Sequence, residues 1–122
     1  MTGYSTNIER ATEENEDFRH VLYTGEYTQL VLMTLQPGED IGRETHPDVD
    51  QFIRIESGTA TAVLDGEETR LDDGDVLVIP AGAEHNVTNT SDDTPLRLYT
   101  LYSPPEHPDG TVQATKPQEE VH

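Results

Sequence analysis

The chain has 122 residues, no cysteine, and seven basic residues against 25 acidic ones, which gives a formal net charge of −18 at pH 7. A field of this sign repels nucleic acid and anionic membranes, so we expect neither as a partner. The absence of cysteine excludes disulfides, thiol nucleophiles and cysteine-based metal sites. A chain of this length can bury the core of one domain.

The composition also bears on location and source. Residues 1–20 lack the basic start and apolar run of a secretory signal, and no apolar run approaches membrane-spanning length, so we expect a cytoplasmic protein. Lysine occurs once and arginine six times. An acid-rich, lysine-poor surface keeps a protein soluble in concentrated salt, where self-repulsion is screened, which favours a halophilic source over an ordinary acidic cytosolic protein.

The chain begins with a polar, charged segment, residues 1–17, in which Ile8, Ala11 and Thr12 indicate no more than a turn of helix. From Phe18 onward, residues typical of strands take over. Strands are predicted over residues 18–24, 28–35, 51–56, 59–64, 67–71, 75–79, 85–89 and 96–102. Such short, regularly spaced strands indicate an all-β sandwich or barrel. We therefore divide the chain into an N-terminal arm (1–17), a β-barrel domain (18–105) and a C-terminal tail (106–122).

Two predicted strands show which residues face the core. Residues 28–35 are apolar on both faces, which predicts a fully buried strand. In residues 51–56, Gln51, Ile53 and Ile55 share one face. Because the isoleucines should face the core, Gln51 is carried inward with them, and a buried amide needs a partner.

Residues 74–89 combine glycine, proline, histidine and asparagine at a distinctive spacing: Gly74, Pro80, Gly82, His85 and Asn89. This pattern resembles the second cupin motif at every fixed position. The resemblance implies a small single-domain cupin, with a jelly-roll barrel of two antiparallel sheets. We expect Asn89 to fix a turn rather than to touch a substrate.

Residues 38–58 resemble the first cupin motif with two substitutions. Gly38 and Gly58 frame the motif, and His46 fits it. Glu44 stands where the family usually has its first histidine, and Gln51 where it usually has a glutamate. Together, the two substitutions keep one negative charge among these motif residues but move it from position 51 to position 44.

The resemblance implies a divalent metal site inside one end of the barrel, with Glu44, His46, Gln51 and His85 as ligands. Strand geometry alone puts Glu44 and His46 on one face. Two imidazoles, one carboxylate and an amide oxygen suit non-haem Fe(II), and Mn, Co, Ni and Zn are compatible. The alternative is a barrel without metal, in which Glu44, His46 and Gln51 form a hydrogen-bonded polar pocket.

Two functions fit such a site. The first is a metal-dependent enzyme that acts on a small polar molecule, of the dioxygenase, isomerase or lyase class found among cupins, with Glu44 or a metal-bound hydroxide as the base. The second is a non-catalytic module that binds a small ligand. A purely structural protein is disfavoured, because it gives no reason to send a carboxylate, an imidazole and an amide inward.

Two features outside the motifs lead to further expectations. Phe52 lies on the outward face of its strand, and together with the cupin resemblance it favours a homodimer. His107 lies in the tail. It could belong to a lid over the barrel mouth or to a segment docked on the outside, and we favour the outside.

Overall fold

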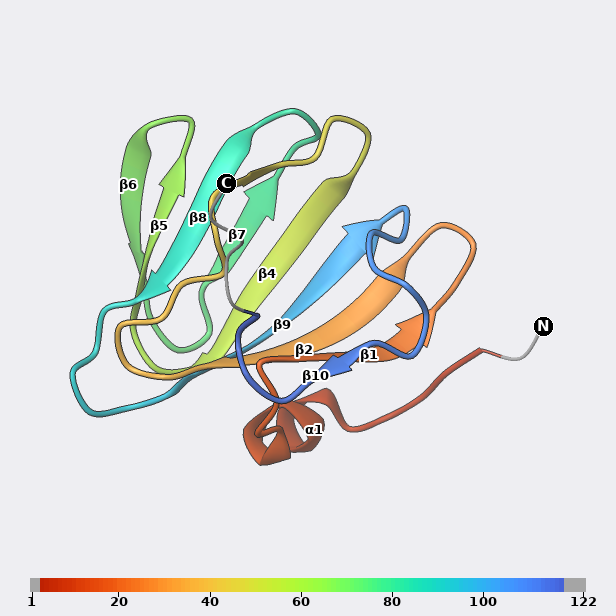
Figure 1. Ribbon diagram of the computed structural model, residues 1–122, viewed down its shortest axis with the longest axis horizontal. Coiled ribbons are helices and arrows are strands. Elements are labelled where there is room, and N and C mark those ends of the chain that lie inside the picture. The colour runs from red at the N-terminus through yellow and green to blue at the C-terminus, as the bar shows by residue number, and fades with distance from the viewer. Residues whose placement is uncertain (1–2, 118–122) are drawn as a thin grey trace.

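The fold is built almost entirely from short antiparallel strands (Figure 1). The computed structural model describes residues 3–117. Within that range one short helix precedes ten strands: α1 (Ile8–Glu14), β1 (Arg19–Thr24), β2 (Gln29–Leu35), β3 (Glu44–Thr45), β4 (Asp50–Ser57), β5 (Ala60–Leu64), β6 (Glu67–Leu71), β7 (Val76–Ile79), β8 (Glu84–Asn89), β9 (Leu96–Ser103) and β10 (Val112–Gln113). The all-β fold class is confirmed.

The strands form two antiparallel sheets (Figure 1), one in the order β10-β1-β2-β9-β4-β7 and the other in the order β3-β8-β5-β6. Between β2 and β9 the chain crosses from one sheet to the other at every connection except that between β5 and β6. Such crossing between two facing sheets is the jelly-roll arrangement. Apolar side chains from both sheets make one core, among them Val31, Met33, Leu35, Ile53, Ile55, Ala62, Val87 and Leu98.

The two burial predictions for individual strands are confirmed. Every residue of β2 except Leu30 is buried. In β4, the exposed fractions of Gln51, Ile53 and Ile55 are 2%, 1% and 0%. The alternation of β4 therefore does place an amide inside the barrel.

Two motif residues act in the turns. Gly58 has a φ of +110°, and a Cβ there would lie 3.0 Å from the carbonyl oxygen of Pro95, so a larger residue would be strained. Asn89 is fully buried. Its Nδ2 donates to the carbonyl oxygens of Leu35 and Thr94 at 3.0 and 2.9 Å, and its Oδ1 accepts from the backbone N–H of Ser91 at 2.9 Å. Asn89 thus fixes a turn, as predicted.

Both ends of the described chain pack against the larger sheet. Helix α1 begins after Asn7, whose side chain accepts from the backbone N–H of Arg10, and the helix contacts β2, β4 and β9. At the other end, β10 pairs with β1. The sequence analysis did not predict β10, because two residues are too few to show an alternation. Within residues 3–117, no helix has the length and apolarity that crossing a membrane requires.

Candidate metal centre

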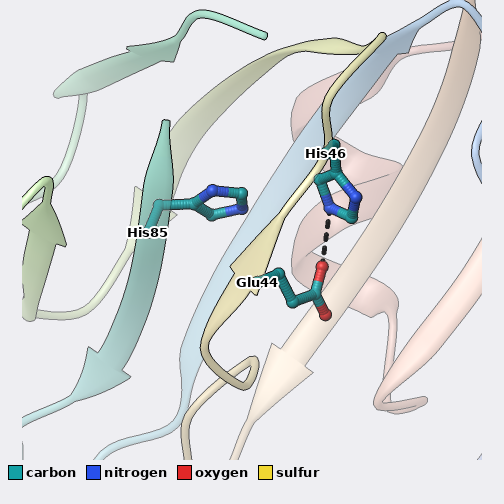
Figure 2. A group of neighbouring side chains, drawn as sticks. All are labelled: Glu44, His46 and His85. Atoms are coloured by element: carbon teal, nitrogen blue, oxygen red, sulfur yellow. Dashed lines mark ion pairs between the residues drawn. The ribbon is translucent and has the colours of Figure 1, made fainter. Parts of the chain in front are cut away.

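The pairing of β3 with β8 brings the first two site residues together. Glu44 and His85 are directly opposite each other in the antiparallel register, so their side chains lie on the same face. His46 follows Glu44 by two residues and returns to that face. The carboxylate and the two imidazoles converge (Figure 2), and one potential ligand atom of each lies within 4.8 Å of the others. The structure therefore contains a Glu-His-His cluster that could bind a metal ion.

The ring of His85 is oriented as a metal ligand should be. The residue is 2% exposed, and its Nδ1 lies 3.1 Å from the carbonyl oxygen of Ala83. A carbonyl can only accept, so this contact places the proton on Nδ1 and leaves the lone pair on Nε2. That Nε2 is buried and has no hydrogen-bond partner. A buried acceptor without a partner is costly, and binding a metal ion would remove the cost.

Glu44 and His46 present two donor atoms side by side. Oε2 of Glu44 is 2.7 Å from Nε2 of His46 (dashed in Figure 2). The alignment is nevertheless not that of a hydrogen bond, since the same Nε2 is buried without a hydrogen-bond partner. An ion with bonds of about 2.1 Å and ligands at right angles holds neighbouring donor atoms about 3 Å apart. The spacing of these two atoms fits such a coordination shell.

Gln51 approaches from the other sheet. Its Nε2 donates to the hydroxyl of Thr100 at 3.0 Å, while its Oε1 is buried without a partner. Its register partner on β9 is Tyr102, whose ring centroid is 6.1 Å from that of His46, edge to face. An orphaned amide oxygen fits an oxygen ligand, so coordination by Gln51 stays a prediction that this environment favours.

The C-terminal tail supplies site residues that the sequence analysis missed. The side chain of Gln29 accepts from the backbone N–H groups of Glu106 and His107 at 3.1 and 3.0 Å, and donates to the His107 carbonyl at 2.8 Å. Held there, Glu106 places Oε1 3.2 Å from Nδ1 of His46. The expectation that this segment docks away from the barrel mouth was wrong. No pattern in the sequence indicates where the chain goes after Pro105.

Two further groups beside the cluster have shifted pKa values. Burial, together with the nearby Glu44 carboxylate, raises the pKa of Tyr102 well above its usual value, so Tyr102 stays a phenol. Burial, followed by the charges of Arg19 and His46, lowers the pKa of His107 to about 4. The rings of Tyr102 and His107 meet edge to face, with centroids 5.0 Å apart. Near neutral pH, two uncharged rings thus lie beside the cluster, that of Tyr102 from β9 and that of His107 from the tail.

Residues 31–102 match the family model described as Cupin domain. This chain belongs to the cupin family. It is similar to YrkC of Bacillus subtilis, an uncharacterised protein, at 48% identity over 119 residues, which cover 93% of this chain and 63% of YrkC. It therefore spans somewhat less than two thirds of that relative's length.

Two other relatives are informative. A crystal structure of a Bacillus halodurans protein is similar to this chain at a TM-score of 0.89 and 42% identity, covering 93% of this chain and 89% of that one. Quercetin 2,3-dioxygenase of B. subtilis is 33% identical over 78 residues, which are 64% of this chain but only 23% of that enzyme. The likeness to the B. halodurans structure runs through nearly the whole fold, and that to the dioxygenase through one part of a longer protein.

Proposed function

We propose that this cupin binds one divalent metal ion through Glu44, His46 and His85, with the amide oxygen of Gln51 as a fourth ligand, and that it acts as a metal-dependent enzyme on a small polar molecule. The observation that carries the proposal is the buried Nε2 of His85, which has a free lone pair and no partner. Two imidazoles and one carboxylate favour Fe(II), while Mn, Co, Ni and Zn remain compatible.

The protein residues have separate tasks in this proposal. The bound metal would supply a Lewis acid for a substrate oxygen. The carbonyl of Ala83 orients His85, and Glu106 orients His46 by lying against the nitrogen that faces away from the cluster. Glu44 keeps 29% of its side chain exposed, so one carboxylate oxygen can reach a ligand in the opening and take a proton from it. Tyr102 stays a phenol, so its hydroxyl can donate a hydrogen bond but holds its proton tightly.

The reaction class is proposed from the donor set and from the relatives. A likeness to quercetin 2,3-dioxygenase and the Fe(II)-type donor set support an oxygenase, while isomerases and lyases can use the same shell. The test is oxygen consumption by the Fe(II)-loaded protein with flavonols, diketones and thiols. Turnover that is lost in His85→Gln but kept in His20→Gln supports the enzyme, since His20 lies on β1 outside the cluster.

The competing function is a cupin that binds a small ligand without turnover. It would be favoured by one tightly held metal ion per chain combined with no turnover across the substrate panel. A preparation that binds no metal under any loading condition would overturn the metal site and the enzyme proposed on it. The cytoplasmic location and the halophilic source stay predictions; whole-cell fractionation and thermal unfolding in concentrated salt test them.

We further propose a homodimer that uses the outer face of β4 and β7. Phe52 stacks at a tilt on Tyr99, with ring centroids 6.5 Å apart, and its register partner Val78 is 61% exposed. A second copy would cover this apolar strip. Light scattering should give the mass of a dimer for the parent and of a monomer for Val78→Asp. A monomeric parent would contradict the proposal.

A further inference from the structure

A cavity of about 310 Å³ lies beside the Glu-His-His cluster and shares one residue with it. Its walls include Phe18, Arg19, Ile41, Arg43, Glu44 and Lys116. Small-molecule sites begin at about 300 Å³, so the cavity suits a small ligand. Three of the chain's seven basic residues gather here, although acidic residues number 25. The cavity wall therefore holds three cations and one carboxylate, that of Glu44, in a strongly negative protein.

Arg19 is the unusual member of this group, because it is buried and has no counterion among the residues that the structure describes. It is 8% exposed. Its guanidinium donates from Nη1 to the neutral amide oxygen of Gln113 and lies 5.1 Å from the centroid of the Phe18 ring. Its Nε is buried and has no hydrogen-bond partner. Within residues 3–117, no carboxylate lies within ion-pair distance of Arg19, and an uncompensated buried charge is strongly destabilising.

The other two cations are placed differently. Lys116 is paired with Asp40. Arg43 is mostly exposed and lies 3.8 Å from Glu84, which is exposed as well. Each of these two cations therefore has a carboxylate neighbour, which Arg19 lacks within residues 3–117. Arg19 thus offers the free hydrogen-bond donor of the cavity wall, while Arg43 and Lys116 are each shared with a carboxylate.

We propose that this cavity binds a small molecule that carries a carboxylate or a phosphate, with Arg19 as the residue that receives the anionic group. The planar fork of a guanidinium matches either anion. Because Glu44 borders both the cavity and the cluster, a molecule anchored at Arg19 would extend its other polar groups toward His46 and His85. As a statement about substrate class the inference rests on the proposed function, whereas binding of the anion does not.

The first measurement uses the chelator-treated full chain at constant ionic strength. Thermal unfolding is followed with succinate, with inorganic phosphate, and with succinamide as the neutral counterpart of succinate. A ligand that binds only the folded state raises the melting temperature. At least one of the two anions should raise it, and succinamide should not. The arm that responds identifies the anion as carboxylate or phosphate. An equal response to succinate and succinamide, or none to either anion, overturns the proposal.

The second measurement locates the site with Arg19→Met, which removes the charge and keeps the apolar stem. The anion should bind at least tenfold more weakly, since a charge-assisted hydrogen bond is lost. Without anion, the same variant should melt at a higher temperature than the parent, because a buried charge without a partner has been removed. Arg70→Met is the matched control, as Arg70 is exposed and paired with Asp72. Unchanged affinity in Arg19→Met, or the same loss in Arg70→Met, overturns the assignment.

Because both measurements use metal-free protein, they separate this inference from the proposed metal site. Anion binding that persists in His85→Gln supports the cavity even if the metal proposal fails. Loss of anion binding in metal-free His85→Gln, with Arg19 intact, would show that the anion occupies the cluster and would overturn the cavity as its site.

Discussion

Replacing Gln51 by glutamate restores the residue that cupins usually carry there, and the structure predicts opposite effects with and without metal. Gln51 is 2% exposed. Its Nε2 donates to the hydroxyl of Thr100, which is a neutral group. A carboxylate at this position would lose its hydration and gain only neutral donors, so its pKa should rise.

The size of the effect follows from that rise. A shift of about three units, from about 4.3 in the unfolded chain to about 7 in the folded one, would cost about 4 kcal/mol once the folded-state carboxylate is ionised. Because the folded pKa is the higher one, the cost should be absent below about pH 4.3, grow as the pH rises, and level off above about pH 7. A bound divalent ion would compensate the charge, so the loss should disappear on metal loading.

The assay is urea unfolding of the parent and of Gln51→Glu at pH 4.5 and pH 8, each with chelator and with Mn²⁺. We expect similar stability at pH 4.5, a marked loss for the variant at pH 8 in chelator, and recovery with Mn²⁺. Gln36→Glu adds the same charge at an exposed position and should show neither effect. Equal stability of Gln51→Glu and parent at pH 8 in chelator would refute the dry, metal-facing environment assigned to Gln51.

Three further predictions concern the surroundings of the site. Asn89→Ala should lower the free energy of unfolding by about 3 kcal/mol in urea, because a buried side chain loses its three hydrogen bonds; a loss below about 1 kcal/mol would contradict its role in the turn. Glu106→Gln should weaken metal binding about tenfold by calorimetry, with an unchanged melting temperature of the metal-free protein, because Glu106 orients His46; equal affinity would leave Glu106 without that task. The pKa of His107 is lowered from 6.5 to about 4, so its contribution to stability is present above about pH 6.5 and is lost as the pH falls toward 4. His107→Asn should flatten the metal-free stability profile in that window, and an unchanged slope would argue against a buried neutral ring.

The sequence predicted the parts of this site that depend on local rules. Alternation in β4 was enough to send Gln51 inward, and the two-residue spacing put Glu44 and His46 on one face. The motif around His85 indicated which distant strand would meet them. Strand alternation and the motif therefore predicted the residues of the cluster, but neither could predict the groups that surround it.

The missed parts depend on contacts between distant segments. Glu106 reaches His46 only because the side chain of Gln29 holds the tail, and the sequence at the start of β2 gives no sign of such a role. Arg19 appears in the sequence as an ordinary polar residue of a strand. Its burial follows from facing inward on β1, opposite the unpredicted β10. The cavity beside the cluster could therefore be found only in the structure.

The measurement that tests the central claim most directly is the number of imidazoles bound to the metal. Electron spin-echo spectra of the Cu(II)-loaded protein should show two imidazole nitrogens in the parent and in His20→Gln, and one in His85→Gln, with one ion per chain in the parent. Spectra of His85→Gln that still show two imidazoles, or a parent that holds no ion after loading, would contradict the account.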